Sequence, residues 1–429
     1  MPPARHPRRR TYTLVAGGEE IVVDADVIVV GAGAAGLAAA RRLGSAGVAV
    51  LVLEARWRIG GRVHTDREFT RFPVERGAEL LQGAGSPLGQ LAKEIGARQT
   101  PAMTMRRGRV LDGGRLRGLL PWTLPSAPKL ASVMLAVRRS PGKPDESLAD
   151  LVARRRPGAR TLRMAEAIAN DACTTASEFS VHEMAAVMGG AEESGGQQRL
   201  RDGFDQVIDH LAADCAVELN NPVKAIRRSA DGVIVEADRT YTARAVVVTI
   251  PLGVLKAGGI EFSPQLPAAK QEAIEQLRMY SATKVILHFD RVWWPESMSY
   301  LLADNGVPVL WPPRPTEPVL TAFVTGPRSD ALRPPPGPVA RVIEVLRPHL
   351  RGAELVDSQV VDWGTDPWTR GGYSSAAPGG SHLRAVLAAP CGPIHFAGEA
   401  TDPISPGTVS GALRSGNRAA EAVLRSLNL

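Results

Sequence analysis

Hydrophobic positions near the start of the chain predict a strand, a helix and a second strand. Residues 27–30 form an unbroken apolar run, and apolar side chains recur at helical spacing over residues 37–43. A second apolar run covers residues 48–53 and ends at Glu54. Apolar runs on either side of a helix are typical of a parallel βαβ unit whose strands are buried on both faces. The pattern therefore indicates an α/β fold.

The pattern changes several times further along the chain. Residues after about position 100 are rich in arginine, proline and short helical segments, whereas residues 216–251 are rich in strand-forming positions. A helix is expected at 267–277, and residues 394–424 have the pattern of a strand, a loop and a helix. No internal repeat is present. We expect a dinucleotide domain built from discontinuous pieces, with a second domain inserted between them.

The segment "SATKVILHFD", residues 281–290, predicts a buried strand that carries a lysine. Val285, Leu287 and Phe289 lie on one face of this strand and Ile286 on the other. Lys284 stands among them, and burying an unpaired ammonium has a large free-energy cost. A lysine at this place needs either a function or a route to solvent from the strand edge.

Length and charge limit the class of protein. The 429 residues suffice for two or three domains, with the apolar and charged fractions of a globular protein. Four of the seven net positive charges come from a tail without acidic residues, at Arg5, Arg8, Arg9 and Arg10. The rest of the chain has no long basic run and few aromatic residues on which bases could stack, which argues against nucleic acid as a partner.

The sequence gives no sign of a membrane segment, a disulfide framework or a metal site. Glu19 and Glu20 interrupt any apolar stretch after the tail, and no apolar run is long enough to span a bilayer. Cys173, Cys215 and Cys391 are far apart and show no C-x-x-C spacing. We expect a cytoplasmic protein with reduced thiols and no metal.

A glycine motif stands directly between the first strand and the helix. Gly31, Gly33 and Gly36 form G-x-G-x-x-G. The first glycine permits a tight turn, the second lets the backbone approach a pyrophosphate, and the third allows close packing of helix and strand. Glu54, at the end of the second strand, is placed to accept hydrogen bonds from ribose hydroxyls. The motif predicts dinucleotide binding and does not choose between NAD and FAD.

The residues after Glu54 bear on the choice between NAD and FAD. The segment "EARWRIGGRVHT" carries Arg56, Gly60, Gly61 and Arg62, and Arg62 offers a fork of donors for phosphate. With "VVVTIPLGVLKAGGIEFSPQLPAAKQEAIEQL" and "IHFAGEAT…GTVSGALRSGNRAA", it resembles the flavin-containing amine oxidase family. That family includes monoamine oxidases, polyamine oxidases, lysine-specific histone demethylases and L-amino-acid oxidases. The resemblance extends from about residue 24 to the C-terminus and is strongest to the polyamine oxidase branch.

The resemblance implies a two-domain α/β flavoprotein. Its Rossmann-type FAD-binding domain is built from discontinuous segments, and the inserted substrate-binding domain has a mixed sheet and helices. The expected division is a basic tail and first strand region at 1–23, an FAD-binding domain at 24–78, 200–265 and 390–429, and a substrate-binding domain at 79–199 and 266–389. The resemblance implies these cofactor-binding residues: Gly31, Gly33, Gly36, Glu54, Arg56, Gly60, Gly61, Arg62, Gly77, Val223, Gly398, Glu399, Thr408 and Val409.

Three residues are expected to take part in catalysis. Lys284 matches a family lysine that hydrogen-bonds a water touching flavin N5, where an ammonium stabilises the negative charge that develops on oxygen. In "VVDWGTDPWTRGGYSSAAPGG", Trp363 matches the tryptophan against the flavin ring and Tyr373 the tyrosine of the substrate wall. An aromatic wall attracts a cation and favours the neutral, reactive amine. Trp368 is expected to pack in the core.

Departures from the family pattern bear on the cofactor and the substrate. Gly372 stands where monoamine oxidases attach FAD to a cysteine, so non-covalent FAD is expected. Thr408 replaces the second aromatic of the monoamine oxidase cage. Leu80 occupies the position of the arginine that binds the substrate carboxylate in L-amino-acid oxidases, so the resemblance implies that this clamp is absent. Gln82 matches a polar substrate-contacting position of polyamine oxidases, and Glu79 could hold a distal ammonium or be a structural carboxylate.

The resemblance therefore implies an FAD-dependent oxidase of a polyamine- or diamine-like amine. Hydride transfer to flavin N5 would give an imine, O2 would reoxidise the flavin with release of H2O2, and hydrolysis would give an aldehyde and an amine or ammonia. Two alternatives stay open. One is an L-amino-acid or specialised-metabolite oxidase with a carboxylate anchor in the arginine-rich stretch 98–117, and the other is a flavin-carrying interaction module. The oligomeric state is open, with a homodimer as one option.

Overall fold

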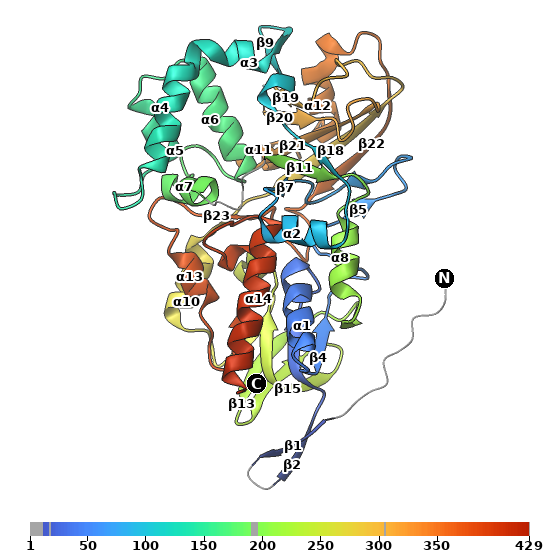
Figure 1. Cartoon of the computed structure of the whole chain (residues 1–429), viewed down its shortest axis with the longest axis vertical. Helices are drawn as coiled ribbons and strands as arrows, with labels where there is room; N and C mark the ends of the chain where they lie inside the picture. Colours follow the sequence, from blue (N-terminus) through green and yellow to red (C-terminus); the bar gives the residue numbers. More distant parts are fainter. Residues whose placement is uncertain (1–11, 17–18, 190–195, 304–305, 429) are drawn as a thin grey trace.

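The computed structural model describes residues 12–16, 19–189, 196–303 and 306–428. The four arginines of the basic tail lie outside these residues, so the structure does not bear on them. The elements form two halves that are stacked along the long axis of the molecule, with the C-terminus in the lower half of Figure 1. Over the described ranges, no helix has both the length and the apolarity needed to cross a bilayer.

An eight-stranded sheet forms the centre of the lower half. Its strands are β3 (Ala25–Val30), β4 (Val50–Leu53), β12 (Ala216–Glu218), β13 (Ala225–Ser229), β14 (Gly232–Glu236), β15 (Thr240–Val248), β16 (Glu261–Ser263) and β24 (Ile394–Phe396). Their order is β12-β4-β3-β15-β14-β13-β16, and β24 also pairs with β15. The strands β12, β4, β3, β15 and β24 are parallel, so their carboxyl ends meet at one edge.

Helices cover both faces of this sheet. The helices α1 (Ala34–Ser45), α2 (Pro87–Glu94), α8 (Asp205–Ala212) and α14 (Val409–Ser426) share a core with one face. In α1 the alanines let α14 come close, and the two helices lie side by side in Figure 1. The helices α9 (Leu252–Lys256), α10 (Ala268–Gln276) and α13 (Leu383–Ala388) form a further cluster beside the other face.

A seven-stranded sheet forms one side of the upper half. Its strands, in spatial order, are β10 (Arg115–Gly118), β9 (Gly108–Asp112), β19 (Tyr300–Leu302), β20 (Val309–Trp311), β21 (Val319–Thr325), β18 (Ala282–Phe289) and β22 (Leu355–Asp362). The faces of β18 are as predicted, because Val285, Leu287 and Phe289 share one core cluster and Ile286 belongs to another. The helices α11 (Pro327–Ala331) and α12 (Pro338–Leu346) accompany this sheet.

A group of helices forms the other side of the upper half (Figure 1). These are α3 (Leu119–Thr123), α4 (Ala127–Arg138), α5 (Leu148–Ala153), α6 (Ala159–Asp171) and α7 (Val181–Gly189). Helices α4 to α7 share an apolar core that includes Val137, Leu148 and Ala169. The short segments predicted after position 100 are therefore a helical layer of their own.

Small sheets complete the structure. They are β1 (Tyr12–Ala16) with β2 (Glu19–Val23), β5 (Thr65–Asp66) with β6 (Val74–Glu75), β7 (Leu81–Gln82) and β8 (Gln99–Pro101) with β11 (Gln197–Leu200), and β17 (Arg278–Met279) with β23 (Ser374–Ser375). Several of them lie between the two halves in Figure 1. They bring segments from distant parts of the chain to the region where the halves meet.

Candidate functional site

A cavity of about 630 Å³ is lined by residues of both halves. From the lower half come the turn between β3 and α1, the segment 53–63 after β4, and the start of α14. From the upper half come residues of α6, α7, β18, β20 and β21. The cavity thus begins at the carboxyl edge of the parallel strands, where open α/β sheets bind their ligands.

The glycine motif forms the turn at this edge. Gly31 has φ +104°, a conformation that favours glycine, and its N–H donates to the Leu53 carbonyl at 2.8 Å. A Cβ at Gly36 would lie 1.9 Å from the Gly31 carbonyl oxygen, so this position packs the helix onto the turn and does not line the cavity. A Cβ at Gly33 would meet its nearest atom only at 4.0 Å, which leaves the backbone open to the cavity at the N-terminus of α1.

The carboxylate of Glu54 is fixed beside this turn. It accepts hydrogen bonds from the N–H groups of Ala32 and Arg56, both at 2.8 Å. The side chain is buried and borders the cavity. The two backbone donors fix the orientation of the acid, and its carboxylate keeps lone pairs for further donors such as ribose hydroxyls.

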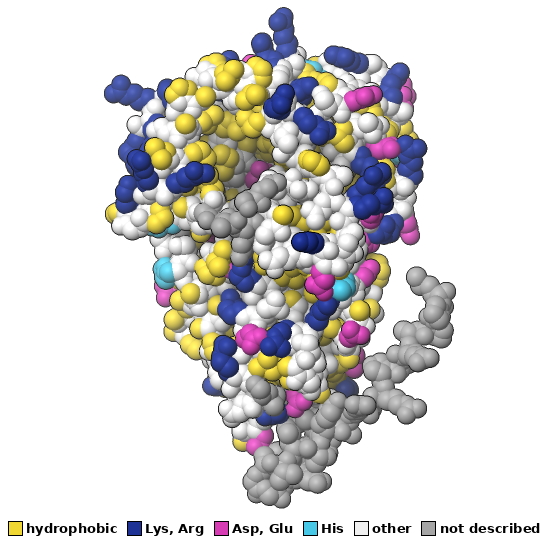
Figure 2. Space-filling model, viewed as in Figure 1, with side chains coloured by type: hydrophobic (Ala, Val, Ile, Leu, Met, Phe, Trp, Pro, Cys, Tyr) yellow, Lys and Arg dark blue, Asp and Glu magenta, His cyan; other side chains and the backbone are white. Residues whose placement is uncertain are grey.

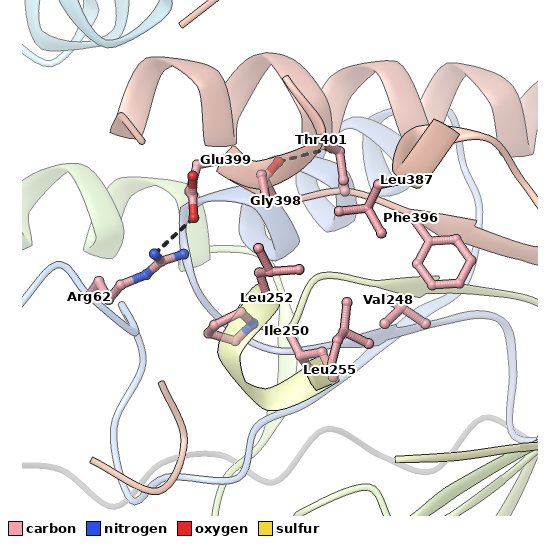
Figure 3. A pocket seen from close by; sticks show the side chains of 13 residues that line it. Arg62, Val248, Ile250, Leu252, Leu255, Leu387, Phe396, Gly398, Glu399 and Thr401 are labelled. Atoms are coloured by element: carbon pink, nitrogen blue, oxygen red, sulfur yellow. Dashed lines mark hydrogen bonds and ion pairs between the residues drawn. The ribbon is translucent and has the colours of Figure 1, made fainter. Parts of the chain in front are cut away.

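Arg62, early in the sequence, forms an ion pair with Glu399, late in the sequence, and both border the cavity. The guanidinium of Arg62 donates to Glu399 at 3.0 Å and to the Gly372 carbonyl at 2.7 Å. Figure 3 shows this pair facing each other beside a small, mainly apolar pocket. Glu399 also accepts from the Ser374 hydroxyl at 2.7 Å and the Gly407 N–H at 2.9 Å. Burial alone would raise the pKa of Glu399, but the charge of Arg62, the Ser374 hydroxyl and the charge of Arg384 hold it below its ordinary value.

Arg56 binds the segment 366–369 through its guanidinium. Its guanidinium makes two bonds to Asp366, at 2.5 and 2.9 Å, and one to the Thr369 hydroxyl at 2.9 Å. The pairing fixes the segment that leads to Gly372 and Tyr373. Arg56 and Arg62 both line the cavity, but the guanidinium of each donates hydrogen bonds to groups of the protein.

The remaining residues of the predicted cofactor set also lie at the cavity. Gly60 and Gly61 have φ of +96° and +57°, and Gly398 has φ +121°. A Cβ at Gly77 would lie 1.8 Å from the Arg62 carbonyl oxygen, so the backbone there tolerates no side chain. Val223 borders the same cavity.

This donor set fits a flavin dinucleotide. The glycine turn and the start of α1 offer N–H groups to a pyrophosphate, and Glu54 offers acceptors to a ribose. Gly33 and Gly61 leave the floor of the cavity without side chains, with a Cβ at Gly61 only 3.5 Å from the Gly33 Cα. The cavity continues from this turn to Trp363 and Tyr373, the residues expected at the flavin ring.

The ammonium of Lys284 has protein partners. It donates to the Glu79 carboxylate at 2.8 Å and to the Glu75 carbonyl at 2.9 Å. The side chain is 3 % exposed and borders the cavity, so it does not reach solvent from the strand edge. Its ammonium also lies 5.5 Å from the centre of the Trp311 ring. The lysine is therefore a buried cation with a counter-ion.

Glu79 is shared by several donors. Besides Lys284 it accepts from the Arg199 guanidinium and from the Trp311 indole N–H, each at 2.8 Å. Burial alone would raise the pKa of Glu79, but Lys284 and Arg199 hold it below its ordinary value. The neighbouring Glu75 differs, because burial raises its pKa to about 8. Two cations thus share one carboxylate, and Glu79 is already paired at the place where it was expected to hold a substrate ammonium.

Tyr373 forms part of the wall of the same cavity. Its hydroxyl donates to the backbone carbonyl of Asp171 at 2.5 Å, and burial raises its pKa well above the ordinary value. Trp363 is buried and donates its indole N–H to the Arg76 carbonyl at 3.1 Å. Both aromatic residues border the cavity.

The environment of Gly372 bears on how a flavin is attached. A Cβ at this position would lie 2.5 Å from the Cβ of Ala282 and 3.0 Å from the sulfur of Cys173. Burial raises the pKa of Cys173 to about 11, so the thiol stays protonated, and it points to the carbonyls of Tyr280 and Ser281. Position 372 thus carries no thiol and has little room for a side chain, which agrees with non-covalent FAD.

The last predicted positions lie near the start of α14 and on β7. Thr408 is the N-cap of α14: its hydroxyl oxygen accepts from the Gly411 N–H at 2.9 Å. Val409 is the first residue of that helix. Gln82 lies on β7, which pairs with β11. All three border the cavity.

One expectation was wrong and several residues were not anticipated. Trp368 is 39 % exposed and borders the cavity, because the turn set by Asp366 holds it away from the core. No local sequence pattern indicated Arg199, Trp311 or Asp171, because each contacts residues that are distant from it in the sequence. In the described ranges no three His, Cys, Asp or Glu side chains are grouped as metal ligands.

Comparisons with known proteins agree with this geometry. The model of the flavin containing amine oxidoreductases matches residues 34–424. Polyamine oxidase 2 of Arabidopsis thaliana is 32% identical over 459 aligned residues, which cover 96% of this chain and 91% of that protein. Lysine-specific histone demethylase 2 of Homo sapiens is 28% identical over 96% of this chain and 56% of its own length.

Solved structures share the fold. Cyclohexylamine oxidase from Brevibacterium oxydans IH-35A has a TM-score of 0.80 at 24% identity and covers 94% of this chain and 100% of its own. A triple mutant of putrescine oxidase has a TM-score of 0.81 at 25% identity, with coverages of 94% and 99%. The likeness therefore extends over both halves of the fold.

Proposed function

The chain belongs to the family of flavin-containing amine oxidoreductases, and we propose that it oxidises a diamine- or polyamine-like amine with O2 as the acceptor. It is a flavoenzyme with FAD as its cofactor and an amine as its substrate class. The proposal adds the reaction: the amine becomes an imine, O2 becomes H2O2, and water hydrolyses the imine to an aldehyde and an amine or ammonia.

One observation carries the proposal. The buried ammonium of Lys284 and the aromatic face of Tyr373 border the same cavity as the glycine turn that fits the dinucleotide. A cation, an aromatic wall and a dinucleotide site in one cavity support oxidation of an amine by a flavin and the later reaction with O2.

FAD, when bound, supplies the redox chemistry, because it accepts a hydride from the carbon next to the nitrogen and passes two electrons to O2. The protein's side chains have other tasks. The face of Tyr373 contacts the amine, and the loss of water in this apolar part of the cavity favours the neutral, reactive form of the amine. Trp311 and Phe323 extend the apolar lining and exclude water from the reacting carbon. Lys284 keeps a positive charge beside the cavity for the step in which charge develops on oxygen.

The amino-acid oxidase alternative lacks a carboxylate anchor among the described residues. Arg98 pairs with Asp202 at the surface, and none of the described arginines between 98 and 117 borders the cavity. The arginines that do border it, Arg56 and Arg62, are paired with Asp366 and Glu399. An amino acid would therefore leave its carboxylate unpaired, which is costly in an apolar site.

The test is anaerobic bleaching of the flavin absorbance by diamines, polyamines, monoamines and L-amino acids at matched concentration. We expect amines to bleach the flavin and the carboxylated analogues to have no effect. Bleaching by amino acids alone would overturn the proposal in favour of an amino-acid oxidase. A yellow protein that no compound bleaches would favour a flavin-carrying interaction module.

A further inference from the structure

The helical side of the upper half carries large apolar side chains at its surface. Leu120 in α3, Leu124 in the short 3-10 turn η2 (Leu124–Ser126) and Leu135 in α4 are 40, 60 and 47 % exposed. Single exposed leucines are common on proteins and need no explanation. Three of them on consecutive elements form a patch, which does need one.

Helix α4 is apolar on its inner and on its outer side. On the inner side Val133 and Val137 are buried, and Met134 borders the cavity. On the outer side the positions 124, 128, 131 and 135 recur at the spacing of one helix face, and all four are exposed and apolar. A surface helix ordinarily turns a polar face to water. The composition of α4 therefore indicates that its outer side has a partner.

The chain around these leucines is basic. Residues 113–144 contain no Asp or Glu and six Lys and Arg residues, at Arg115, Arg117, Lys129, Arg138, Arg139 and Lys143. All six side chains are exposed, and within the described ranges only Arg117 among them has an ion-pair partner, Asp112 at 3.4 Å. Arg115 and Arg117 belong to the arginine-rich stretch 98–117, and neither borders the cavity. These cations are thus available to a partner at the surface.

The segment that leads into α6 extends the patch. Arg155 donates to the Ser132 hydroxyl and Arg160 to the Trp122 carbonyl, both at 3.1 Å, so this segment lies beside α3 and α4. Leu162 follows in α6 and is 49 % exposed. The basic apolar surface consists of the six basic residues of 113–144 with Leu120, Leu124, Leu135 and Leu162. Figure 2 shows hydrophobic, Lys and Arg side chains over the helical side of the upper half, whereas most acidic side chains of that half are seen over the side with the sheet.

The charge of this surface selects among possible partners. A second copy that met the same surface on a two-fold axis would bring like charges together, which is unfavourable. Nucleic acid needs exposed rings on which bases stack, but Trp122, the one aromatic residue of 113–144, is buried. Leucines that stand among arginines and lysines match a bilayer with anionic lipids, where apolar side chains enter the interface and cations stay at the phosphates.

We propose that the basic apolar surface binds the face of a membrane that contains anionic phospholipids, with no segment crossing the bilayer. The four leucines enter the boundary between headgroups and acyl chains, and the basic side chains lie at the level of the phosphates. Helix α4 then lies between the membrane and the cavity, since Met134 of this helix borders the cavity. The proposal concerns binding alone and does not depend on which amine is oxidised.

Flotation of the full-length holoenzyme with lipid vesicles tests the proposal. Vesicles of phosphatidylcholine alone are compared with vesicles that also contain about 30 mol % phosphatidylglycerol, at about 0.05 and about 0.5 M NaCl. We expect binding to the anionic vesicles that weakens about 10-fold at the higher salt concentration, and weak binding to phosphatidylcholine alone. A protein that does not bind the anionic vesicles at low salt would overturn the proposal.

Two variants locate the contact. Leu124→Glu should lower the partition coefficient for anionic vesicles about 10-fold, because it replaces an inserted leucine by a charge that lipid phosphates repel. Arg138→Gln combined with Arg139→Gln should lower it by about the same factor, because two cations are lost from the surface.

Val356→Glu is the matched control. Val356 is 61 % exposed on β22, at the opposite edge of the seven-stranded sheet from β10, and acidic residues stand on either side of it at 354 and 357. The new charge lies far from the basic apolar surface and should leave the partition coefficient within about twofold of wild type. None of the substituted residues borders the cavity, so flavin absorbance and anaerobic reduction by an amine without vesicles check that each variant is folded.

Three results would overturn the assignment. Unchanged binding in both variants would place the lipid contact elsewhere, for instance in the basic tail at residues 5–10. A loss confined to the arginine variant would exclude insertion of the leucines. A dimer of wild type that Leu124→Glu dissociates in analytical ultracentrifugation, without vesicle binding by wild type, would assign the surface to a second copy of the chain.

Discussion

At the scale of single residues, the pairing of Lys284 with Glu79 shows how a buried cation is kept in an apolar sheet. The carboxylate lies 2.8 Å from the ammonium, and Arg199 shares it. Two cations and one carboxylate leave this wall of the cavity with an excess of positive charge. Such a wall stabilises negative charge that develops on oxygen, and the arginine keeps Glu79 paired if the lysine is removed.

Lys284→Met should therefore separate the two half-reactions. Reduction of the flavin by an amine should stay within about threefold of wild type, whereas reoxidation by O2 should slow about 100-fold. Stopped-flow measurement of both steps checks this. Lys270→Met is the matched control, because Lys270 is equally buried and does not border the cavity. Among the described residues, its ammonium donates to the carbonyls of Val386 and Leu387 and lies over the Phe396 ring. Unchanged reoxidation in Lys284→Met would remove the lysine from the oxygen reaction.

Glu75 makes the stability of the fold depend on pH. Burial raises its folded-state pKa from 4.5 to about 8. Its stabilising contribution is fully present below about pH 4.5 and is lost as the pH rises through 8, since the folded protein holds the proton more tightly than the unfolded chain.

Glu75→Gln should remove this dependence while keeping the side chain's volume. Between pH 6 and pH 8, the free energy of unfolding of wild type should fall relative to the variant by up to about 1.4 kcal/mol per pH unit. Urea unfolding of both proteins at several pH values is the measurement. Parallel pH profiles would show that Glu75 is ionised throughout.

At the scale of elements, the contact between α1 and α14 depends on glycine. A Cβ at Gly416 of α14 would lie 2.2 Å from the carbonyl oxygen of Ala35 in α1. The alanines of α1 and this glycine let the helices approach so closely that their N-termini meet at the cavity.

Gly416→Ala should destabilise the protein by about 1–3 kcal/mol, because the added methyl group forces the helices apart. Gly44→Ala in α1 is the matched control. No atom lies within 4 Å of a Cβ at that position, and alanine favours the helix by about 0.5–1 kcal/mol. Chemical denaturation of the two variants should show changes of opposite sign. A neutral Gly416→Ala would mean that the helices separate without cost.

The elements that could be predicted are those with local signals. The glycine turn, the strands on either side of α1 and the faces of β18 follow from neighbouring residues. The partners of Lys284 could not be predicted in this way, because Arg199 is 120 residues from Glu79 and no pattern connects them. Trp368 was misplaced for the same reason: the pairing of Arg56 with Asp366, 310 residues apart, fixes its turn.

At the scale of the whole molecule, contacts at the cofactor site join segments that are distant in the sequence. Arg62 of the lower half donates a hydrogen bond to the Gly372 carbonyl. Glu399 accepts hydrogen bonds from the Ser374 hydroxyl and the Gly407 N–H. Segments from both ends of the sequence therefore depend on one site.

Removal of the flavin should loosen the whole molecule. We expect the apoprotein to unfold at a lower temperature, and FAD at 100 times its dissociation constant to restore about 2.7 kcal/mol. Thermal unfolding followed by circular dichroism measures this. Riboflavin is the control, because it lacks the pyrophosphate and adenosine that the glycine turn and Glu54 are placed to bind. Equal recovery with riboflavin would contradict the assignment of that turn.

The contribution of α14 to the cavity also has a consequence for synthesis of the protein. Gly398, Glu399, Thr408 and Val409 are synthesised long after Gly31, yet they complete the site that opens at Gly31. A nascent chain therefore displays the glycine turn before the rest of the site exists. Capture of the vitamin-derived cofactor must wait until α14 has emerged from the ribosome.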